Sequence, residues 1–309
     1  TLSMLVPAGH QIQLVLGSLR EWLIVGGLAA LVALYSWALR KLKSRAVEAA
    51  PEPTVASGDY AREELPRYMR HIMLREIGGP GQKKLKAAKV LVIGAGGLGS
   101  PALMYLAAAG VGTIGVIDDD VVEETNLQRQ IAHTDERIGM PKVFSAEAAM
   151  KAVNPYVSVR PYHRRLEAGI VDDLVSDYDL VLDGTDNFKT RALVNAACVA
   201  AKVPLVSGAA IRLEGQLSVF DPRRDDSPCY HCIYGHGSEA ELTCSEAGVV
   251  GPLVGLVGSL QALEALKLLA QFGEPLVGRL LLIDALGSRF RELRVKRDAG
   301  CSVCGSDAQ

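Results

Sequence analysis

A short apolar run leads straight into a glycine-rich turn, and this junction constrains the fold of the chain more than any other feature. The run is KVLVI at residues 89–93, and Gly94, Gly96 and Gly99 follow it in the pattern G-x-G-x-x-G. Between a strand and a helix, these glycines allow a tight turn and let a phosphate approach the positive helix N-terminus. Asp118 lies about twenty residues further on, where a carboxylate can bind ribose hydroxyls. The junction predicts a nucleotide site in an α/β sheet. The alternative is a turn without a ligand, and the pattern does not separate a dinucleotide from ATP.

From residue 60 onward, short apolar runs alternate with helical segments. We expect strands at 89–93, 113–117, 179–183 and 204–207, and helices at 100–109, 140–153 and 188–201. This alternation predicts an α/β fold with a doubly wound, mostly parallel, Rossmann-like sheet. Residues 215–220 and 280–283 are expected to add C-terminal strands around a long apolar helix at 249–270.

Two Cys-x-x-Cys pairs point to a metal. Cys229 and Cys232 form one pair, and Cys301 and Cys304 form the other, about seventy residues later. Two such pairs are typical of a four-thiolate zinc site, and four protein ligands leave no open position for substrate, so the zinc is expected to be structural. Six cysteines in 309 residues are too few for a disulfide scaffold, which favours a reducing compartment. Cys198 lies on the apolar face of a predicted helix and is expected in the core.

The N-terminal part contains an uncharged apolar stretch at residues 22–39. As a helix it would span about 27 Å, close to the hydrocarbon thickness of a bilayer. Trp22 and Trp37 near its ends suit the membrane interfaces. A signal peptide, the alternative, would carry its positive charges before the apolar run. The charges lie mainly after it, at Arg40, Lys41, Lys43 and Arg45.

These observations predict four regions. They are an N-terminal segment (1–21), a transmembrane helix (22–39), a basic flank and Pro/Ala/Ser-rich linker (40–59) and a nucleotide-binding domain with the zinc site (60–309). The basic excess after the helix predicts an anchor in the inner, cytoplasmic membrane, with the domain in the cytoplasm. The net charge of −2 gives no electrostatic reason to expect nucleic acid as a partner.

Polar residues around the glycine turn favour ATP over a nicotinamide cofactor. Asn126, Arg129 and Lys142 follow Asp118, and cations can neutralise charge that develops during phosphoryl or nucleotidyl transfer. Asp186 and Asn187 follow a predicted strand, at the sheet edge where ligands bind in such folds. A carboxylate there could hold Mg²⁺ against a triphosphate. Alternatively, either residue could simply cap the next helix.

Over residues 65–304 the chain resembles the ubiquitin-activating-enzyme-like adenylyltransferases of the MoeB, ThiF and HesA family, and it is most similar to the molybdopterin-synthase branch. The matching stretches, in order, are RYMRHIML, VLVIGAGGLGSPALMYLAAAGVG, IDDDVVEETNLQRQ, GMPK, LVLDGTDN, PLVSGAAIRLEGQ, CYHC, LTCSEAGVVGPLVGLVGSLQALEALK and CSVC.

The resemblance implies a reaction. The C-terminal Gly-Gly carboxylate of a small ubiquitin-fold sulfur carrier attacks the α-phosphate of ATP, giving an acyl-adenylate and pyrophosphate. The branch implies the small subunit of molybdopterin synthase as carrier, in molybdenum cofactor biosynthesis. A thiamine-pathway carrier is the nearest alternative. A nicotinamide-dependent dehydrogenase, from a different class, would leave Arg129, Lys142 and the cysteine pairs without a role.

The resemblance also implies residue roles. The residues expected to bind ATP are Gly94, Gly96, Gly97, Gly99, Asp118, Asn126, Arg129, Lys142, Asp186 and Asn187. Those expected to be catalytic are Asp186, which binds Mg²⁺, together with Arg129, Lys142 and Arg70. Arg70 matches an arginine that the family inserts into the partner subunit's ATP site, which implies a homodimer. The two cysteine pairs match the family's zinc ligands. Cys244 matches a cysteine that can form a thioester or acyl-disulfide with the carrier, or it is an inert thiol.

Overall fold

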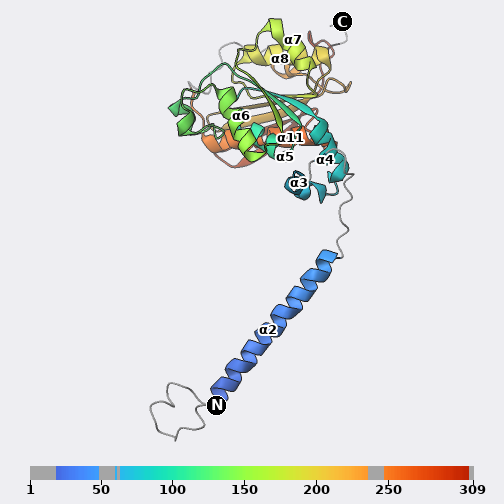
Figure 1. Ribbon diagram of the computed structural model, residues 1–309. Coiled ribbons are helices and arrows are strands. Elements are labelled where there is room, and N and C mark those ends of the chain that lie inside the picture. The colour runs from blue at the N-terminus through green and yellow to red at the C-terminus, as the bar shows by residue number, and fades with distance from the viewer. Residues whose placement is uncertain (1–18, 49–59, 61–62, 236–246, 306–309) are drawn as a thin grey trace. The chain divides into compact units, whose positions relative to one another are not determined.

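The computed structural model describes residues 19–48, 60, 63–235 and 247–305, and within the first helix it describes the side chains of residues 22–37 (Figure 1). The chain divides into two compact units, Thr1–Thr54 and Val55–Gln309, and each is described here by itself. Cys244, the candidate thioester cysteine, lies outside the described residues.

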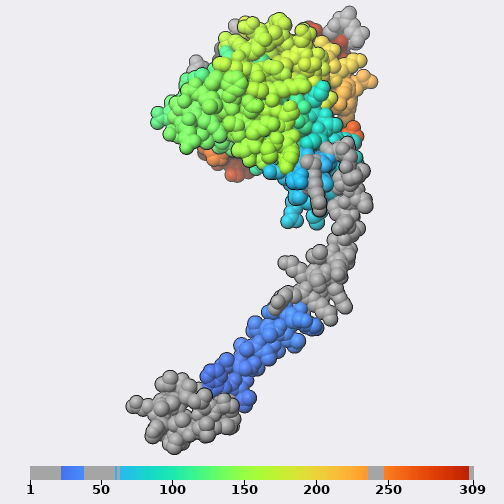
Figure 2. Space-filling view, viewed as in Figure 1, coloured from blue at the N-terminus to red at the C-terminus, as the bar shows by residue number. Residues whose placement is uncertain are grey.

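The first unit contains one long helix, α2 (Leu19–Glu48), which continues past the apolar stretch at both ends. Its large apolar side chains are exposed along the described stretch, with Trp22 56% and Trp37 57% exposed. This stretch is the blue segment in Figure 2. A helix that is apolar on all sides is stable where an apolar environment surrounds it. By length and composition, however, the helix among the described residues that could cross a membrane is α11 (Gly251–Ala270), which is half buried inside the domain, and Trp22–Trp37 counts as a shorter apolar segment. Support for a transmembrane helix in the first unit is therefore weak.

The second unit is built on one eight-stranded sheet in the order β3-β2-β1-β4-β5-β6-β7-β8. The strands are β1 (Lys89–Ile93), β2 (Thr113–Ile117), β3 (Ser158–Tyr162), β4 (Leu180–Asp183), β5 (Leu205–Ile211), β6 (Glu214–Phe220), β7 (Arg279–Asp284) and β8 (Arg289–Arg294). The first five in spatial order pair in parallel, and β5 through β8 pair antiparallel. This arrangement confirms the predicted parallel sheet with added C-terminal strands.

Helices cover both faces of this sheet, as Figure 1 shows. The helices of the unit are α3 (Leu65–Ile72), α4 (Gly78–Ala87), α5 (Gly99–Ala109), α6 (Lys142–Val153), α7 (Ala168–Ser176), α8 (Phe188–Ala201), α9 (Tyr230–Tyr234) and α11, with 3-10 turns η2 (Glu124–Asn126) and η3 (Asp135–Arg137). Strand β1 shows how the layers form, because Val90 and Val92 pack with α5, α6 and α11 while Leu91 and Ile93 pack with α7 and α8. Alternate side chains of a strand point to opposite faces, so both faces of a central strand need apolar residues, as at Val90–Ile93 of β1.

Several elements were not predicted from the sequence. The edge strand β3 is only partly buried and contains Pro161, and the opposite edge strand β8 is exposed along its whole length. Neither has an apolar pattern, because an edge strand contributes little to the core. The predicted elements also shift slightly: β5 continues to Ile211, and α6 begins at Lys142.

Candidate active site

The strand order places two loops side by side at the centre of the sheet. β1 lies between β2 and β4, with Ile93 opposite Asp183. From β1, the chain adds β2 and β3 on one side and then β4 and β5 on the other, so the strand order reverses between β1 and β4. Ligands of open α/β sheets bind at such a switch point, outside the carboxyl ends of the strands. The two loops that leave these strands touch, because Gly184 N–H donates to Ile93 O at 2.9 Å. The predicted nucleotide turn and the predicted Asp186 turn therefore form one site.

The glycine loop needs its glycines for steric reasons. Gly94 has φ +92°, and a Cβ on Gly99 would lie 1.9 Å from Gly94 O. A Cβ on Gly97 would lie 3.2 Å from Val254 of α11, so a core helix supports the loop from behind. The loop ends at the start of α5, where the N-cap residue Leu98 offers no side-chain hydrogen bond to the described helix. Uncapped N–H groups at a helix N-terminus favour an anion such as phosphate.

Asp118 ties the end of β2 to the glycine loop. Its carboxylate accepts the N–H of Ala95 at 2.7 Å and the N–H of Asp120 at 2.9 Å. Burial raises the pKa of Asp118, and the nearby Lys142 ammonium opposes that shift. Each carboxylate oxygen has two acceptor directions, so Asp118 can still accept ribose hydroxyls while it holds the loop.

Lys142 stands beside this acid. It is buried at the start of α6, and its Nζ lies 2.7 Å from Oδ2 of the exposed Asp120. A salt bridge with one exposed partner exchanges readily with solvent and contributes little to stability. Lys142 is therefore a buried cation near the glycine loop that can change its partner from Asp120 to a phosphate.

The segment around η2 supplies two buried amide oxygens that lack hydrogen-bond partners among the described residues. Asn126 is 7% exposed and Gln130 is 4% exposed, and among the described residues neither Asn126 Oδ1 nor Gln130 Oε1 has a hydrogen-bond partner. Gln130 Nε2 lies 3.8 Å from the position that a Cβ of Gly96 would take, so this amide borders the loop. Arg129, between them, is partly buried and donates to Thr125 O at 3.1 Å. Unsatisfied buried polar atoms are rare in folded proteins, and here they mark a place for a polar ligand.

Gln130 was missed as a site residue, although it stands in the NLQRQ stretch, four positions after Asn126. His133 was missed as well. Its Nε2–H donates to Ala95 O at 2.9 Å, and its Nδ1 is 2.9 Å from Ser145 Oγ. We assign the proton to Nε2 because a carbonyl oxygen can only accept. Burial lowers the pKa of His133.

The β4 turn separates the two roles that the sequence left open. Asn187 caps α8, because its Oδ1 accepts Thr190 N–H at 2.8 Å. Asp186 is exposed, and within the described part of the chain its carboxylate has no hydrogen bond or ion pair. Its neighbour Asp183 is fully buried instead and accepts the N–H and hydroxyl of Thr185. Capping therefore accounts for Asn187 and leaves Asp186 available for a metal ion.

Arg70 lies at the other end of α5. It is exposed on α3, and its neighbour Tyr68 sits so close to Gly110 that a Cβ there would lie 2.4 Å from the ring. Asn154 fixes this corner by donating to both Tyr68 Oη and Ala107 O. α5 has 11 residues, about 16 Å of helix, and it separates this corner from the glycine loop. Arg70 is thus far from the glycine loop of its own chain.

The four paired cysteines come together. The Sγ–Sγ distances are 3.9 Å for Cys229–Cys232, 3.8 Å for Cys229–Cys301 and 3.4 Å for Cys232–Cys304, and all four atoms lie within 4.8 Å of one another. Four sulfurs at about 2.3 Å from a tetrahedral zinc ion stand about 3.8 Å apart, so the cluster fits this metal. Burial raises the pKa of Cys229 to about 11. Cys198 is buried in the core between α7, α8 and the sheet, as predicted.

Fold and site together define a nucleotide-binding α/β protein with a separate thiolate cluster. The model of the ThiF family matches residues 68–303, so the chain belongs to the ThiF family, as its motifs indicated.

Similar proteins agree with this assignment. The molybdopterin-synthase adenylyltransferase of Salmonella typhimurium is 49% identical over 243 residues, which cover 79% of this chain and 97% of that protein. The sulfur carrier protein adenylyltransferase of Thermus thermophilus is 47% identical over 253 residues, which cover 80% and 93%. Among solved structures, E. coli MccB with ATP superposes with a TM-score of 0.69 at 25% identity, covering 80% of this chain and 76% of that one.

Proposed function

We propose that this protein is an enzyme that uses ATP to adenylate the C-terminal Gly-Gly carboxylate of a small ubiquitin-fold sulfur carrier, in molybdenum cofactor biosynthesis. The observation that carries the proposal is the grouping of the glycine loop, buried Lys142 and free Asp186 around one switch point. The 49% identity to a molybdopterin-synthase adenylyltransferase, over nearly all of that protein, supports the choice of carrier.

The chemistry needs positioning more than covalent help. A carboxylate is already ionised at pH 7, so it can attack the α-phosphorus directly. The attack forms a bond from carboxylate oxygen to phosphorus and breaks the bond to the β-phosphate, so pyrophosphate leaves. Arg129 and Lys142 can neutralise the charge that develops on the phosphates. Asp186 would hold Mg²⁺, which neutralises the triphosphate.

We further propose that the active form is a homodimer. Arg70 is exposed and lies a helix length from its own glycine loop, so a role at an ATP site requires a second subunit. The exposed apolar side chains next to it, Met73 at 66% and Leu74 at 48%, are suited to a subunit contact.

In this proposal the zinc ion at the four cysteines is structural. Cys244 is not needed for adenylation, because the acyl-adenylate forms without a thiol; its role would come after that step. A Cys244→Ala variant should therefore keep carrier-dependent pyrophosphate exchange.

The exposed apolar side chains of α2 at residues 22–37 support a membrane anchor, with the ThiF domain in the cytoplasm. In cells, the full chain should then sediment with the inner membrane, resist an alkaline carbonate wash and dissolve in detergent. Release by carbonate alone would contradict the anchor.

The proposed function is tested by ATP–pyrophosphate exchange with purified carriers. The carrier of molybdopterin synthase should support exchange, and the same carrier without its terminal glycine should not. Exchange only with the thiamine-pathway carrier would move the protein to that pathway. NADH binding without exchange by any carrier would favour the dehydrogenase alternative.

A further inference from the structure

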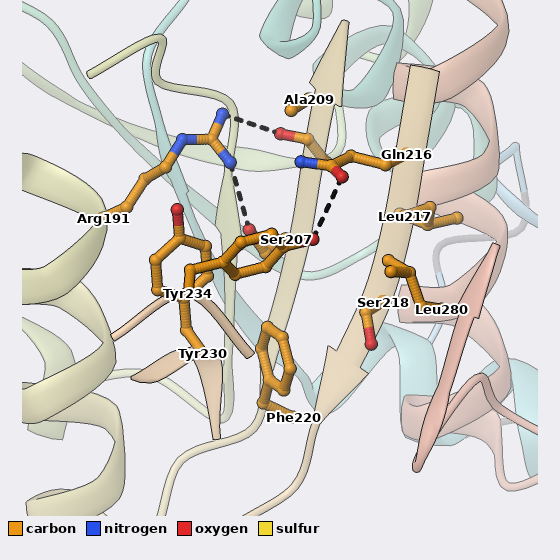
Figure 3. Close-up of a pocket in the computed structure, with 11 residues that line it drawn as sticks. Arg191, Ser207, Ala209, Gln216, Leu217, Ser218, Phe220, Tyr230, Tyr234 and Leu280 are labelled. Carbon is orange, nitrogen blue, oxygen red and sulfur yellow. Dashed lines mark hydrogen bonds between the residues drawn. The ribbon is translucent and has the colours of Figure 1, made fainter. Parts of the chain in front are cut away.

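A buried arginine lies directly under the turn that carries Asp186. Arg191 belongs to α8 and is 6% exposed. Figure 3 shows its guanidinium reaching from α8 to β5, along the wall of a pocket that Tyr230 and Tyr234 also line. It donates to Gly208 O at 2.9 Å, to Ser207 Oγ at 3.4 Å and to Thr185 O. One planar group therefore binds three acceptors on two chain segments.

Asp183 holds the other side of the same turn. Its Oδ1 accepts the N–H of Thr185 at 3.0 Å and the Thr185 hydroxyl at 2.7 Å. Its Oδ2 lies 3.7 Å from Nη1 of Arg191. The N–H, the hydroxyl and the carbonyl of Thr185 are thus all held by one buried ion pair. Thr185 is the residue before Asp186, so this pair fixes the peptide from which the free carboxylate extends.

The Asp183–Asp186 turn is also hydrogen-bonded to α11, the helix that packs against the glycine loop. Gln261 of α11 donates to Asp183 O at 2.7 Å. One helical turn earlier, Gly258 packs against the loop so closely that a Cβ there would lie 2.2 Å from Leu98 O. The helix α11 therefore contacts both the phosphate side and the Asp186 side of the site.

Charge balance alone does not require an arginine here. A buried ion pair is a weak reason for stability, and a lysine would also neutralise Asp183. What lysine lacks is the rigid planar fork that donates to several acceptors at fixed angles. The three acceptors of Arg191 use that fork, two of them being main-chain carbonyls of different segments.

We propose that Arg191 is a positioning residue for the adenylation reaction: it locks the Thr185–Asp186 peptide so that the Asp186 carboxylate meets the metal–triphosphate. The proposal rests on the function proposed above. Arg191 is buried and its guanidinium already donates to Thr185, Ser207 and Gly208, so it acts through the turn and not as a substrate-binding group. Its effect is on how well Asp186 binds Mg²⁺ in the reactive complex.

The test is Arg191→Lys in the full-length chain, measured by carrier-dependent exchange over a range of MgCl₂ concentrations. We expect kcat to fall about a hundredfold, as for misplaced catalytic groups, and the Mg²⁺ concentration for half-maximal rate to rise. Carrier KM should change little. The matched control is Arg224→Lys, since Arg224 forms an exposed pair with the exposed Asp226 and its replacement should leave kcat and the Mg²⁺ dependence unchanged.

A folded Arg191→Lys enzyme with wild-type kcat and Mg²⁺ dependence would overturn the proposal. If that variant does not fold, Arg191→Met combined with Asp183→Asn removes both buried charges, and the same measurement applies to it. Thr185→Ala, which keeps the arginine but removes one bond to Asp183, should shift the Mg²⁺ dependence in the same direction. Absence of exchange in the wild-type protein would instead contradict the proposed function.

Discussion

The nucleotide site lies at the carboxyl ends of the central strands, and we call it the nucleotide edge. This site and the cysteine cluster use polar groups in opposite ways. At the nucleotide edge, Lys142 has an exchangeable partner. Within the described residues, the Asp186 carboxylate and the buried amide oxygens of Asn126 and Gln130 have no partner. In the cluster, the four thiols face one another within 4.8 Å. Polar groups without hydrogen bonds inside the protein are available to a substrate. Thiolates that bind a metal ion would instead stabilise the fold. Chemistry and stability should therefore separate between the two regions.

The largest expected effect tests the nucleotide edge. Replacing Asp186 by alanine removes the carboxylate that would hold Mg²⁺, so carrier-dependent exchange should fall by at least about a thousandfold. The melting temperature should not change, because the side chain is exposed and makes no contact that the fold needs. Exchange and thermal unfolding are measured on the same preparation.

The control for this variant is Asp172→Ala, which removes another exposed carboxylate at α7. It should leave both exchange and melting temperature unchanged. Wild-type exchange in the Asp186 variant would refute the assignment of the site.

Substitution in the cysteine cluster should lower the melting temperature and largely preserve exchange, the reverse of the Asp186 variant. Cys301→Ser would remove one ligand of the proposed zinc ion from a cluster that joins α9 to the C-terminal turn. A loss of about 3 kcal/mol would lower the melting temperature by roughly 6–12 °C. Exchange measured well below that temperature should remain within about a factor of three of wild type, a difference of less than 1 kcal/mol. A zinc chelator should act on the wild-type protein in the same way.

Ser302→Ala is the matched control, since Ser302 lies between the cysteines of the second pair and is exposed. Its bond to His231 is a surface contact, so the variant should melt like wild type. A protein that loses its zinc, stays folded at the assay temperature and stops exchange would show that the metal takes part in catalysis.

The sequence alone was enough to predict structural features that depend on residues close together in the chain. The turn after β1 was predicted because glycines at 94, 96 and 99 satisfy local backbone and packing demands. Edge strand β8 was not predicted, because its exposed arginine-rich side chains have no apolar period. The Arg191–Asp183 pair was missed because its contacts link Thr185, Ser207 and Gly208, and a linear pattern does not show that these segments meet.

For the candidate site residues, the sequence predicted which residues belong to the site, but the structure was needed to separate their roles. Motif and family pattern identified Asp186 and Asn187 together, but only the hydrogen bond from Thr190 N–H to Asn187 separates a cap from a free carboxylate. Similarly, the sequence suggested a ribose-binding Asp118, while its bond to the N–H of Ala95 shows that it also shapes the loop. Such double roles depend on distances across the sheet edge, which residue spacing along the chain does not contain.

The smallest expected effect concerns His133 at the nucleotide edge. Burial lowers its pKa in the folded state, with the Lys142 and Arg137 charges acting in the same direction. A base with a lowered folded pKa stabilises the protein above its ordinary pKa of 6.5, and that stability is lost as the pH falls below this value. The melting temperature should therefore drop between pH 7.5 and 5.5, and His133→Gln should show a shallower drop.

Acid would also protonate the thiolates of the proposed zinc site, so both proteins should lose stability through the cysteine cluster. The wild type and His133→Gln should differ in the slope of melting temperature against pH. This difference measures the contribution of the nucleotide edge, because the substitution leaves all four cysteines in place. Equal slopes in the two proteins would mean that His133 is not held neutral, and the stability cost of acid would then belong to the thiolate cluster.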